Sequence, residues 1–338
     1  MMGISRAKQG GWVLAFSVLA APALAQETDC DILAGYSLIP RIEGAGGVYA
    51  IRDAPSAIAA CEAAMAEDPD EPFFAVLLAR SLTRLDPADD RIVPLLMGAY
   101  EGLPALAGAE LGRVYEFGLG GQAAGEGQAR NFYRLACEFW PDRQAGFACT
   151  QLGVMRIEGR GGEVDEESGF ALLGTLCGDG WGPACTELAF HTDLRGIGSM
   201  DEISAQIAPL FEAGCEAGDL QGCSQFGFRL ELGEGVPMDV ARAKDLYETA
   251  CSGGEPQGCS YLGEVYRSGL GVQPDIEEAV RLFTLGCAGD DSYACVTLGD
   301  ILAGGRGVPV DRPRALAVLE HACWLGDPEG CDAADRLR

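Results

Sequence analysis

Apolar and small residues recur along the chain in a pattern that predicts one helix again and again. In six stretches an apolar residue is followed by a small one: Leu111-Gly112, Leu152-Gly153, Leu188-Ala189, Phe226-Gly227, Leu262-Gly263 and Leu298-Gly299. The pattern predicts helices that begin at Glu110, Gln151, Glu187, Gln225, Tyr261 and Thr297. Glycine inside a helix costs about 1 kcal/mol relative to alanine, so its recurrence predicts close backbone approach between this helix and its partner helix. A closing Gly-x-Gly predicts a helix C-cap and a turn with positive φ.

A second apolar pattern follows each turn and predicts a partner helix. Alanine recurs at one position, and large apolar residues follow three and four places later, which makes one helical stripe. The alanines are Ala129, Ala243, Ala279 and Ala315. Asp239, Asp275 and Asp311 stand 36 residues apart directly before this helix, where a carboxylate caps free amides. A fixed period of this length predicts an all-α fold, a right-handed α/α superhelical solenoid.

The first third of the chain is helical in pattern but irregular. Three helices are predicted there, over residues 54–72, 71–87 and 90–103. The first ends at Pro69, the second at Pro87, and the third where the regular array begins. Residues 39–49 carry too many glycines and a proline to form one helix. We interpret 26–107 as a tetratricopeptide-like region that caps the repeat array of 108–338, because terminal repeats need a polar outer face.

Residues 1–25 resemble a secretory signal. Arg6 and Lys8 precede a short apolar run, and Ala23-Leu24-Ala25 has the small residues of a cleavage site. A membrane anchor is the alternative, but the run from Trp12 to Ala21 is short for a bilayer. The sequence therefore predicts a periplasmic or secreted protein, with no membrane segment after cleavage.

The 14 cysteines fit an exported protein. In an oxidising compartment an even, regularly spaced set predicts disulfides, whereas in the cytosol metal binding would be considered first. Zinc ligands usually stand two to four residues apart, but here seven residues separate most pairs, and only His191 and His321 could add imidazole ligands. We predict no metal site and no cofactor. Short disulfide loops of this kind contribute on the order of 2–3 kcal/mol each.

The formal net charge of −27 bears on the choice of partner. A field this acidic disfavours nucleic acid and anionic membrane surfaces, and it favours a basic protein or peptide. The alternative interpretation is that the carboxylates only solvate the outer faces of the helices. Glu231, Glu234 and Asp239 cluster at one turn, and we interpret them as acids near a helix start.

The repeated pattern L-G-x-x-Y-x-x-G-x-G-V, followed by Asp and then by Ala and aromatic residues, resembles the Sel-like repeat, a relative of the tetratricopeptide repeat. The resemblance covers about Gly108 to Cys331. The seven-residue gap between paired cysteines is similar to a secreted cysteine-rich subgroup of that family. Some members of this subgroup are described as β-lactamases or penicillin-binding proteins. The resemblance implies a solenoid fold, but it transfers no catalytic residue, because the motif residues are packing residues.

Seven disulfides are predicted, six of them across the turn that joins one helical pair to the next. The pairs are Cys30–Cys61, Cys137–Cys149, Cys177–Cys185, Cys215–Cys223, Cys251–Cys259, Cys287–Cys295 and Cys323–Cys331. Cys30–Cys61 is the pair whose spacing fits no repeat. The last unit ends soon after Cys331, so Trp324 and Leu325 are expected to be partly exposed and to offer a second contact surface.

Two function classes remain. In the first, the chain is a monomeric, non-enzymatic scaffold that binds a protein or peptide in a concave groove. The first helix of each pair would line that groove with Arg113, Glu116, Arg156, Arg229, Glu264 and Arg267. In the second, the chain binds a β-lactam or a peptidoglycan fragment and hydrolyses it weakly. The one S-x-x-K motif, Ser5 to Lys8, lies in the predicted signal. His191 is expected at the surface and His321 at a helix end, so we assign no catalytic residue.

Overall fold

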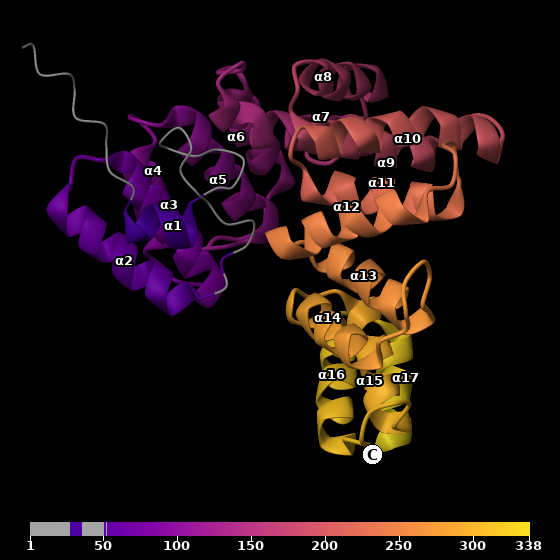
Figure 1. Cartoon of the computed structure of the whole chain (residues 1–338). Coiled ribbons are helices and arrows are strands. Elements are labelled where there is room, and N and C mark those ends of the chain that lie inside the picture. Colours follow the sequence, from indigo (N-terminus) through magenta and orange to yellow (C-terminus); the bar gives the residue numbers. More distant parts are fainter. Residues whose placement is uncertain (1–27, 36–50, 52) are drawn as a thin grey trace, which may run out of the picture.

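The structure is a computed structural model that describes residues 28–35, 51 and 53–338. These residues form 17 α-helices and one short 3₁₀ helix, Arg143–Ala145. Successive helices are antiparallel neighbours in a right-handed superhelix, which confirms the predicted all-α solenoid (Figure 1). The predicted signal and the stretch 39–49 lie outside the described residues. None of the helices described is long and apolar enough to cross a bilayer.

Of the four N-terminal helices, the last three confirm the predicted ones within a few residues, and the first was not predicted. They are α1 (Asp29–Ala34), α2 (Ala54–Glu67), α3 (Pro72–Leu85) and α4 (Ile92–Ala99). Seven A helices then alternate with six B helices. The A helices are α5 (Pro104–Phe117), α7 (Gly146–Glu158), α9 (Gly182–Arg195), α11 (Leu220–Leu232), α13 (Pro256–Ser268), α15 (Ser292–Gly304) and α17 (Pro328–Leu337). The B helices are α6 (Glu126–Cys137), α8 (Glu166–Gly178), α10 (Met200–Glu216), α12 (Val240–Gly253), α14 (Ile276–Ala288) and α16 (Arg312–Trp324).

The predicted starts of the A helices were wrong. Helix α13 begins at Pro256, five residues before the predicted Tyr261, and α7, α9, α11 and α15 show the same offset. The reason is a second set of capping groups. Glu255 accepts hydrogen bonds from two amides of α13, and Asp219 and Asp291 cap α11 and α15. The second cysteine of each of the six pairs in the array therefore lies in the first turns of an A helix.

The A and B helices do pack closely at the repeated glycine, but at Gly112 and Gly263 the glycine meets a side chain and not the predicted backbone. A Cβ built on Gly112 of α5 would lie 2.3 Å from a ring carbon of Tyr133 on α6. Gly263 meets the ring of Phe283 in the same way, with a closest distance of 3.0 Å. Tyr133 and Phe283 are both fully buried. The small residue of the A helix thus leaves a space that the large residue of its B helix fills. We call this space the socket.

The predicted caps and turns of the repeat are confirmed as well. The N-cap residues of α12, α14 and α16 are Asp239, Asp275 and Asp311. Each of their side chains accepts a hydrogen bond from a backbone amide of its helix. Between α13 and α14, Gly269 and Gly271 have φ of 76° and 71°. A side chain is strained in that conformation, so glycine is required there.

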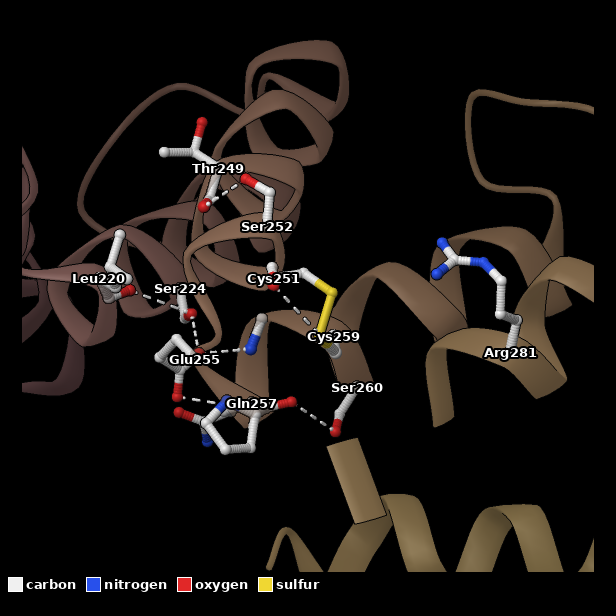
Figure 2. Close-up of a disulfide and its surroundings, with 12 residues drawn as sticks. Leu220, Ser224, Thr249, Cys251, Ser252, Glu255, Gln257, Cys259, Ser260 and Arg281 are labelled. Atoms are coloured by element: carbon white, nitrogen blue, oxygen red, sulfur yellow. Dashed lines mark hydrogen bonds between the residues drawn. A yellow bond between two sulfur atoms is a disulfide. The ribbon is translucent and has the colours of Figure 1, made fainter. Parts of the chain in front are cut away.

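Seven disulfides join the cysteines in the predicted order, and no cysteine among the described residues is free. Cys251 lies in the last turn of α12 and Cys259 in the first turn of α13, with Cα atoms 4.5 Å apart. Figure 2 shows this bridge beside the capping group Glu255. Each of the six bridges in the array ties a B helix to the next A helix, so the disulfides hold repeats together.

A buried hydroxyl next to two of the bridges makes a second connection between repeats. Ser224, directly after Cys223, donates to the carboxylate of Glu255 in the next repeat (Figure 2). Thr186, directly after Cys185, donates to the buried carboxylate of Asp219 in the same way. Burial raises the pKa of Glu255 and of Asp219 against the opposing effect of these bonds. The Cys-Ser/Thr dipeptide repeats in the sequence, and its role was not predicted.

The superhelix brings distant parts of the chain to opposite sides of one opening. Helices α1 to α6 lie on one side and α13 to α17 on the other, with α7 to α12 between them (Figure 1). Each A helix from α5 to α15 also contacts the A helix of the next repeat. The A helices therefore form a continuous face, called the A-helix face below.

Candidate functional site

A cavity of about 640 Å³ lies on the A-helix face between α11, α13 and α15. Its volume is typical of ligand pockets. It is lined by Phe228, Glu231, Gln257, Ser260, Tyr261, Glu264, Asp291, Ser292 and Tyr293. Three consecutive repeats supply these side chains, so the site exists only where repeats stack.

The period of the repeat explains why these side chains share one face. Glu264 stands 36 residues after Phe228, and Tyr293 stands 36 residues after Gln257. Equal positions in successive repeats fall beside one another along a solenoid. The face is therefore a ladder of equivalent positions whose residue types differ from repeat to repeat.

Aromatic rings form the floor of this cavity. Phe228 and Tyr261 are stacked, with ring centroids 5.3 Å apart and planes at 19°. The ring of Tyr247 from α12 supports Tyr261 from behind at 5.2 Å. Tyr293 is 50% exposed at the edge. An exposed ring in the same cavity as a stacked pair offers a flat surface for an apolar or cationic group.

Carboxylates surround the rings. Glu264 accepts a hydrogen bond from the Tyr293 hydroxyl at 3.4 Å and forms an ion pair with Arg267 at 2.5 Å. Glu231 accepts a hydrogen bond from Tyr247 at 2.9 Å. Asp291 adds a third carboxylate at the start of α15.

The negative field of the site acts on its tyrosines. Burial, reinforced by the charges of Asp291 and Glu255, raises the pKa of Tyr261 to about 12. Burial and the charge of Glu264 raise the pKa of Tyr293. Both phenols therefore stay protonated near neutral pH, and the Tyr293 hydroxyl donates to Glu264.

A second cavity of about 450 Å³ continues along the same face toward the C-terminus and shares Tyr293 with the first. Thr297, Asp300 and Arg306 extend its lining from α15 and the turn that follows. An extended segment lying across both cavities would cross α11, α13 and α15.

The structure brings together two of the six predicted groove residues. Glu264 lines the first cavity and Arg267 the second, and the two are ion-paired. Arg229 was predicted one position out of phase, because Phe228 holds the place equivalent to Glu264. Neighbouring residues on a helix point about 100° apart. Arg229 accordingly lies 14% exposed, pairs with Glu234 and packs between the rings of Phe211 and Phe228.

The other three predicted groove residues lie outside these cavities. The Glu116 side chain is 5% exposed, accepts a 2.6 Å bond from Tyr133 and forms a 2.6 Å ion pair with Arg160. Glu116 is therefore a connection between repeats, and its assignment to the groove was wrong. Arg113 pairs with Glu110 at 3.2 Å on the same helix. Arg156 is half-buried on α7.

The histidines and the acidic cluster also have definite places. His191 was predicted at the surface but is buried, at 8% exposed, and burial lowers its pKa. His321 lies in the last turn of α16, as expected. The clustered acids have separate roles, since Glu231 accepts a bond from Tyr247, Glu234 pairs with Arg229 and Asp239 caps α12.

Sequence reasoning missed the aromatic residues of the site. Charge was used to choose candidates, whereas the helix phase would have selected the positions equivalent to Glu264 and Tyr293. Phe228 holds the position equivalent to Glu264, and Tyr261 lies three residues before Glu264 on the same helix. Tyr293 holds the position equivalent to Gln257 in the next repeat. This grouping of rings on one face was the available signal.

Comparison with known proteins identifies the repeat. The Sel1 repeat family matches residues 105–138, 146–175, 223–255, 256–291 and 292–320. The unmatched stretch 176–222 contains the longer unit in which Ala189 replaces the usual glycine. No curated protein matches the chain.

Two solved structures are similar to this chain, and the first of them shows the same architecture of stacked repeats. A Sel1 repeat protein from Oxalobacter formigenes matches with a TM-score of 0.56 and 24% identity, covering 73% of this chain and 98% of that one. A protective antigen of uropathogenic Escherichia coli with an SLR fold matches with a TM-score of 0.49 and 19% identity, covering 87% and 62%.

The fold and the repeat together define a helical-repeat scaffold of the protein-interaction type. Within that class the chain belongs to the Sel1 repeat, or Sel-like repeat, family. The matched segments span most of the array from α5 to α16.

Proposed function

We propose that this protein is an exported scaffold that binds a basic segment of a partner protein on the A-helix face of α11, α13 and α15. The observation that carries the proposal is the cavity in which the exposed ring of Tyr293 and the Phe228–Tyr261 stack stand among Glu231, Glu264 and Asp291. Aromatic rings bind lysine and arginine through cation–π contacts, and neighbouring carboxylates bind them through charge-assisted hydrogen bonds.

The expected complex follows from the geometry of the cavity. A lysine or arginine side chain lies over Tyr293 and reaches Glu264, which exchanges part of its bond with Arg267 for the ligand. A cation over an exposed ring contributes about 0.5–1 kcal/mol, and each exposed ion pair contributes about 0.2–1 kcal/mol. Several such contacts along the ladder are needed for micromolar binding.

The charge of the whole molecule supports the same partner. The excess of 51 acidic over 24 basic residues attracts a basic segment over long range and speeds its association. The seven disulfides fit an oxidising compartment. The proposal includes export of the protein, with residues 1–25 acting as the secretory signal.

Titration of a defined peptide tests the proposal. The probe is a fluorescein-labelled ten-residue peptide of alternating arginine and serine, and its matched counterpart has glutamate in place of arginine. We expect saturable binding of the basic peptide only, weakened about tenfold in Tyr293→Ala and in Glu264→Gln. The control is Glu277→Gln, which removes an exposed carboxylate from α14 outside the cavity.

The peptide pair and the control distinguish site binding from a general charge effect. Equal weakening by Glu277→Gln and Glu264→Gln would show that net charge alone attracts the peptide. Binding of the acidic peptide, or no binding of either, would contradict the proposal directly.

A further inference from the structure

A second cleft, of about 520 Å³, lies where the superhelix brings the N-terminal helices to the last repeats. Arg84 from the end of α3 lines it together with residues of α14, α15 and α16, which stand more than 200 positions later in the chain. We call this space the closing cleft. It does not share a residue with the cavities of the A-helix face.

One backbone position in the closing cleft departs from the repeat. Asp290 has φ of 68°, whereas Gly254 and Gly326, its equivalents 36 residues before and after, have φ of 94° and 90°. Asp290 is the one described non-glycine residue with positive φ. An aspartate held where the other repeats use glycine is strained, and such strain gathers at functional positions.

The carboxylate of Asp290 is engaged with the next repeat. Asp290 Oδ1 lies 3.0 Å from His321 Nε2 on α16. The His321 ring in turn is stacked on Trp324, with centroids 5.6 Å apart and planes at 18°. Trp324 is 76% exposed. Asp290 therefore orients an imidazole that holds a tryptophan ring at the edge of the cleft. The exposure of Trp324 at this end of the chain was predicted.

The charge of the closing cleft is opposite to that of the A-helix face. Two guanidinium groups, of Arg84 and Arg314, face one carboxylate, of Asp290. Arg314 donates to the Thr284 hydroxyl at 2.8 Å, and neither arginine is ion-paired to a carboxylate in the part of the chain that the structure describes. In a chain of net charge −27, two arginines left without acidic partners in one cleft are available to an anion.

The remaining lining is apolar. Leu298 from α15 and Val318 from α16 line the cleft together with the arginines and the tryptophan ring. A ligand that complements the whole cleft has an anionic group, which binds the guanidinium donors, and a flat apolar part, which packs on the indole ring.

We propose that the closing cleft is a binding site for a small aromatic carboxylate. The carboxylate accepts hydrogen bonds from Arg84 and Arg314, and the aromatic body lies against Trp324 over Leu298 and Val318. Because Arg84 comes from α3 and the other groups from the last repeats, such a ligand bridges the two ends of the superhelix. This site is independent of the proposed binding of basic segments.

Calorimetric titration of the full-length oxidised protein with 2-naphthoate tests this site. The matched probe is 2-naphthylmethylamine, which has the same ring system with a positive charge. We expect saturable binding of the carboxylate and not of the amine. Arg84→Ala and Arg314→Ala each weaken it about tenfold, the loss expected for one charge-assisted hydrogen bond. Trp324→Ala weakens it similarly, since it removes the ring on which the ligand lies.

The control is Arg312→Ala, which removes an exposed arginine from the same helix at a position that does not line the cleft. Binding to Arg312→Ala is expected to match that of the unmodified protein. Arg84, Arg314 and Trp324 are exposed, so their replacement leaves the core intact. The proposal is overturned if 2-naphthoate does not saturate, if the amine binds equally well, or if Arg84→Ala and Arg312→Ala have equal effects.

Discussion

The socket at Gly112 gives the sharpest test of how the helical pairs interlock. In Gly112→Ala the new Cβ would lie 2.3 Å from a ring carbon of Tyr133, well inside van der Waals contact. The ring cannot move outward easily, because Tyr133 is fully buried and its hydroxyl is bonded to Glu116 at 2.6 Å. The substitution therefore forces a shift of α6 against α5 and the loss of that hydrogen bond.

The magnitude follows from three contributions. Overpacking a tight core costs typically about 1–3 kcal/mol, and loss of the bond to a charged acceptor costs about 1.5 kcal/mol more. Alanine regains about 1 kcal/mol of helix propensity. The net expectation is a destabilisation of about 2 kcal/mol.

Gly174 on α8 provides a matched control. It lies inside a helix, but a Cβ at this position would meet nothing within 4 Å. Gly174→Ala is therefore expected to stabilise the protein by about 1 kcal/mol through helix propensity alone. Both variants keep all seven disulfides.

Urea unfolding of the oxidised proteins, followed by circular dichroism, measures both changes as shifts of the unfolding midpoint. The midpoint of Gly112→Ala should fall and that of Gly174→Ala should rise. If Gly112→Ala is as stable as Gly174→Ala, the glycine is not a socket, and the explanation of the repeated small residue is wrong.

Three further predictions concern a hydrogen bond at a repeat junction, the dependence of stability on pH, and hydrolytic activity. Ser224→Ala, which leaves the buried Glu255 carboxylate without one donor, should destabilise by about 1–3 kcal/mol in thermal unfolding. The exposed Ser268→Ala should cost under about 0.5 kcal/mol, and equal losses would refute the role of the buried hydroxyl. Burial, with the charges of Asp219 and Glu158, raises the pKa of Glu187 to about 7. The folded state thus holds that proton more tightly than the unfolded state. Stability from this group is complete below about pH 4.5 and declines as pH rises through about 7, by roughly 2 kcal/mol after allowance for partial exposure. Glu187→Gln should flatten that part of the profile of unfolding temperature against pH, and an unchanged slope would contradict the assignment. The scaffold role predicts no turnover of nitrocefin by the pure oxidised protein, and turnover abolished by Glu264→Gln would favour the hydrolytic alternative.

Much of the fold could be predicted because residues with a local structural role, such as helix caps and turn glycines, recur at a fixed spacing in the repeat. The capping of α14 by Asp275 and the turn glycines Gly269 and Gly271 depend on neighbours within one unit. The pairing of Cys251 with Cys259 depends on two adjacent helices. Such short-range requirements are visible in the residue types themselves.

The features that could not be predicted depend on how units stack. The start of α13 was missed because Glu255 was not recognised as its cap. The displacement of Arg229 from the groove came from an error of one residue in helix phase, which turns a side chain by about 100°. The closing cleft between Arg84 and Trp324 arises from the accumulated curvature of the whole array, which no single repeat encodes.

Photocrosslinking most directly tests the central claim that the A-helix face of α11, α13 and α15 binds a basic segment. The ten-residue arginine–serine peptide is prepared with a benzophenone side chain at its centre, irradiated with the oxidised protein, and the adducts are mapped by mass spectrometry. The account predicts adducts on α11, α13 and α15 around Tyr261 and Tyr293, and their loss when unlabelled basic peptide is added in excess. Adducts confined to the B helices or the closing cleft, or spread evenly over the acidic surface, would contradict it.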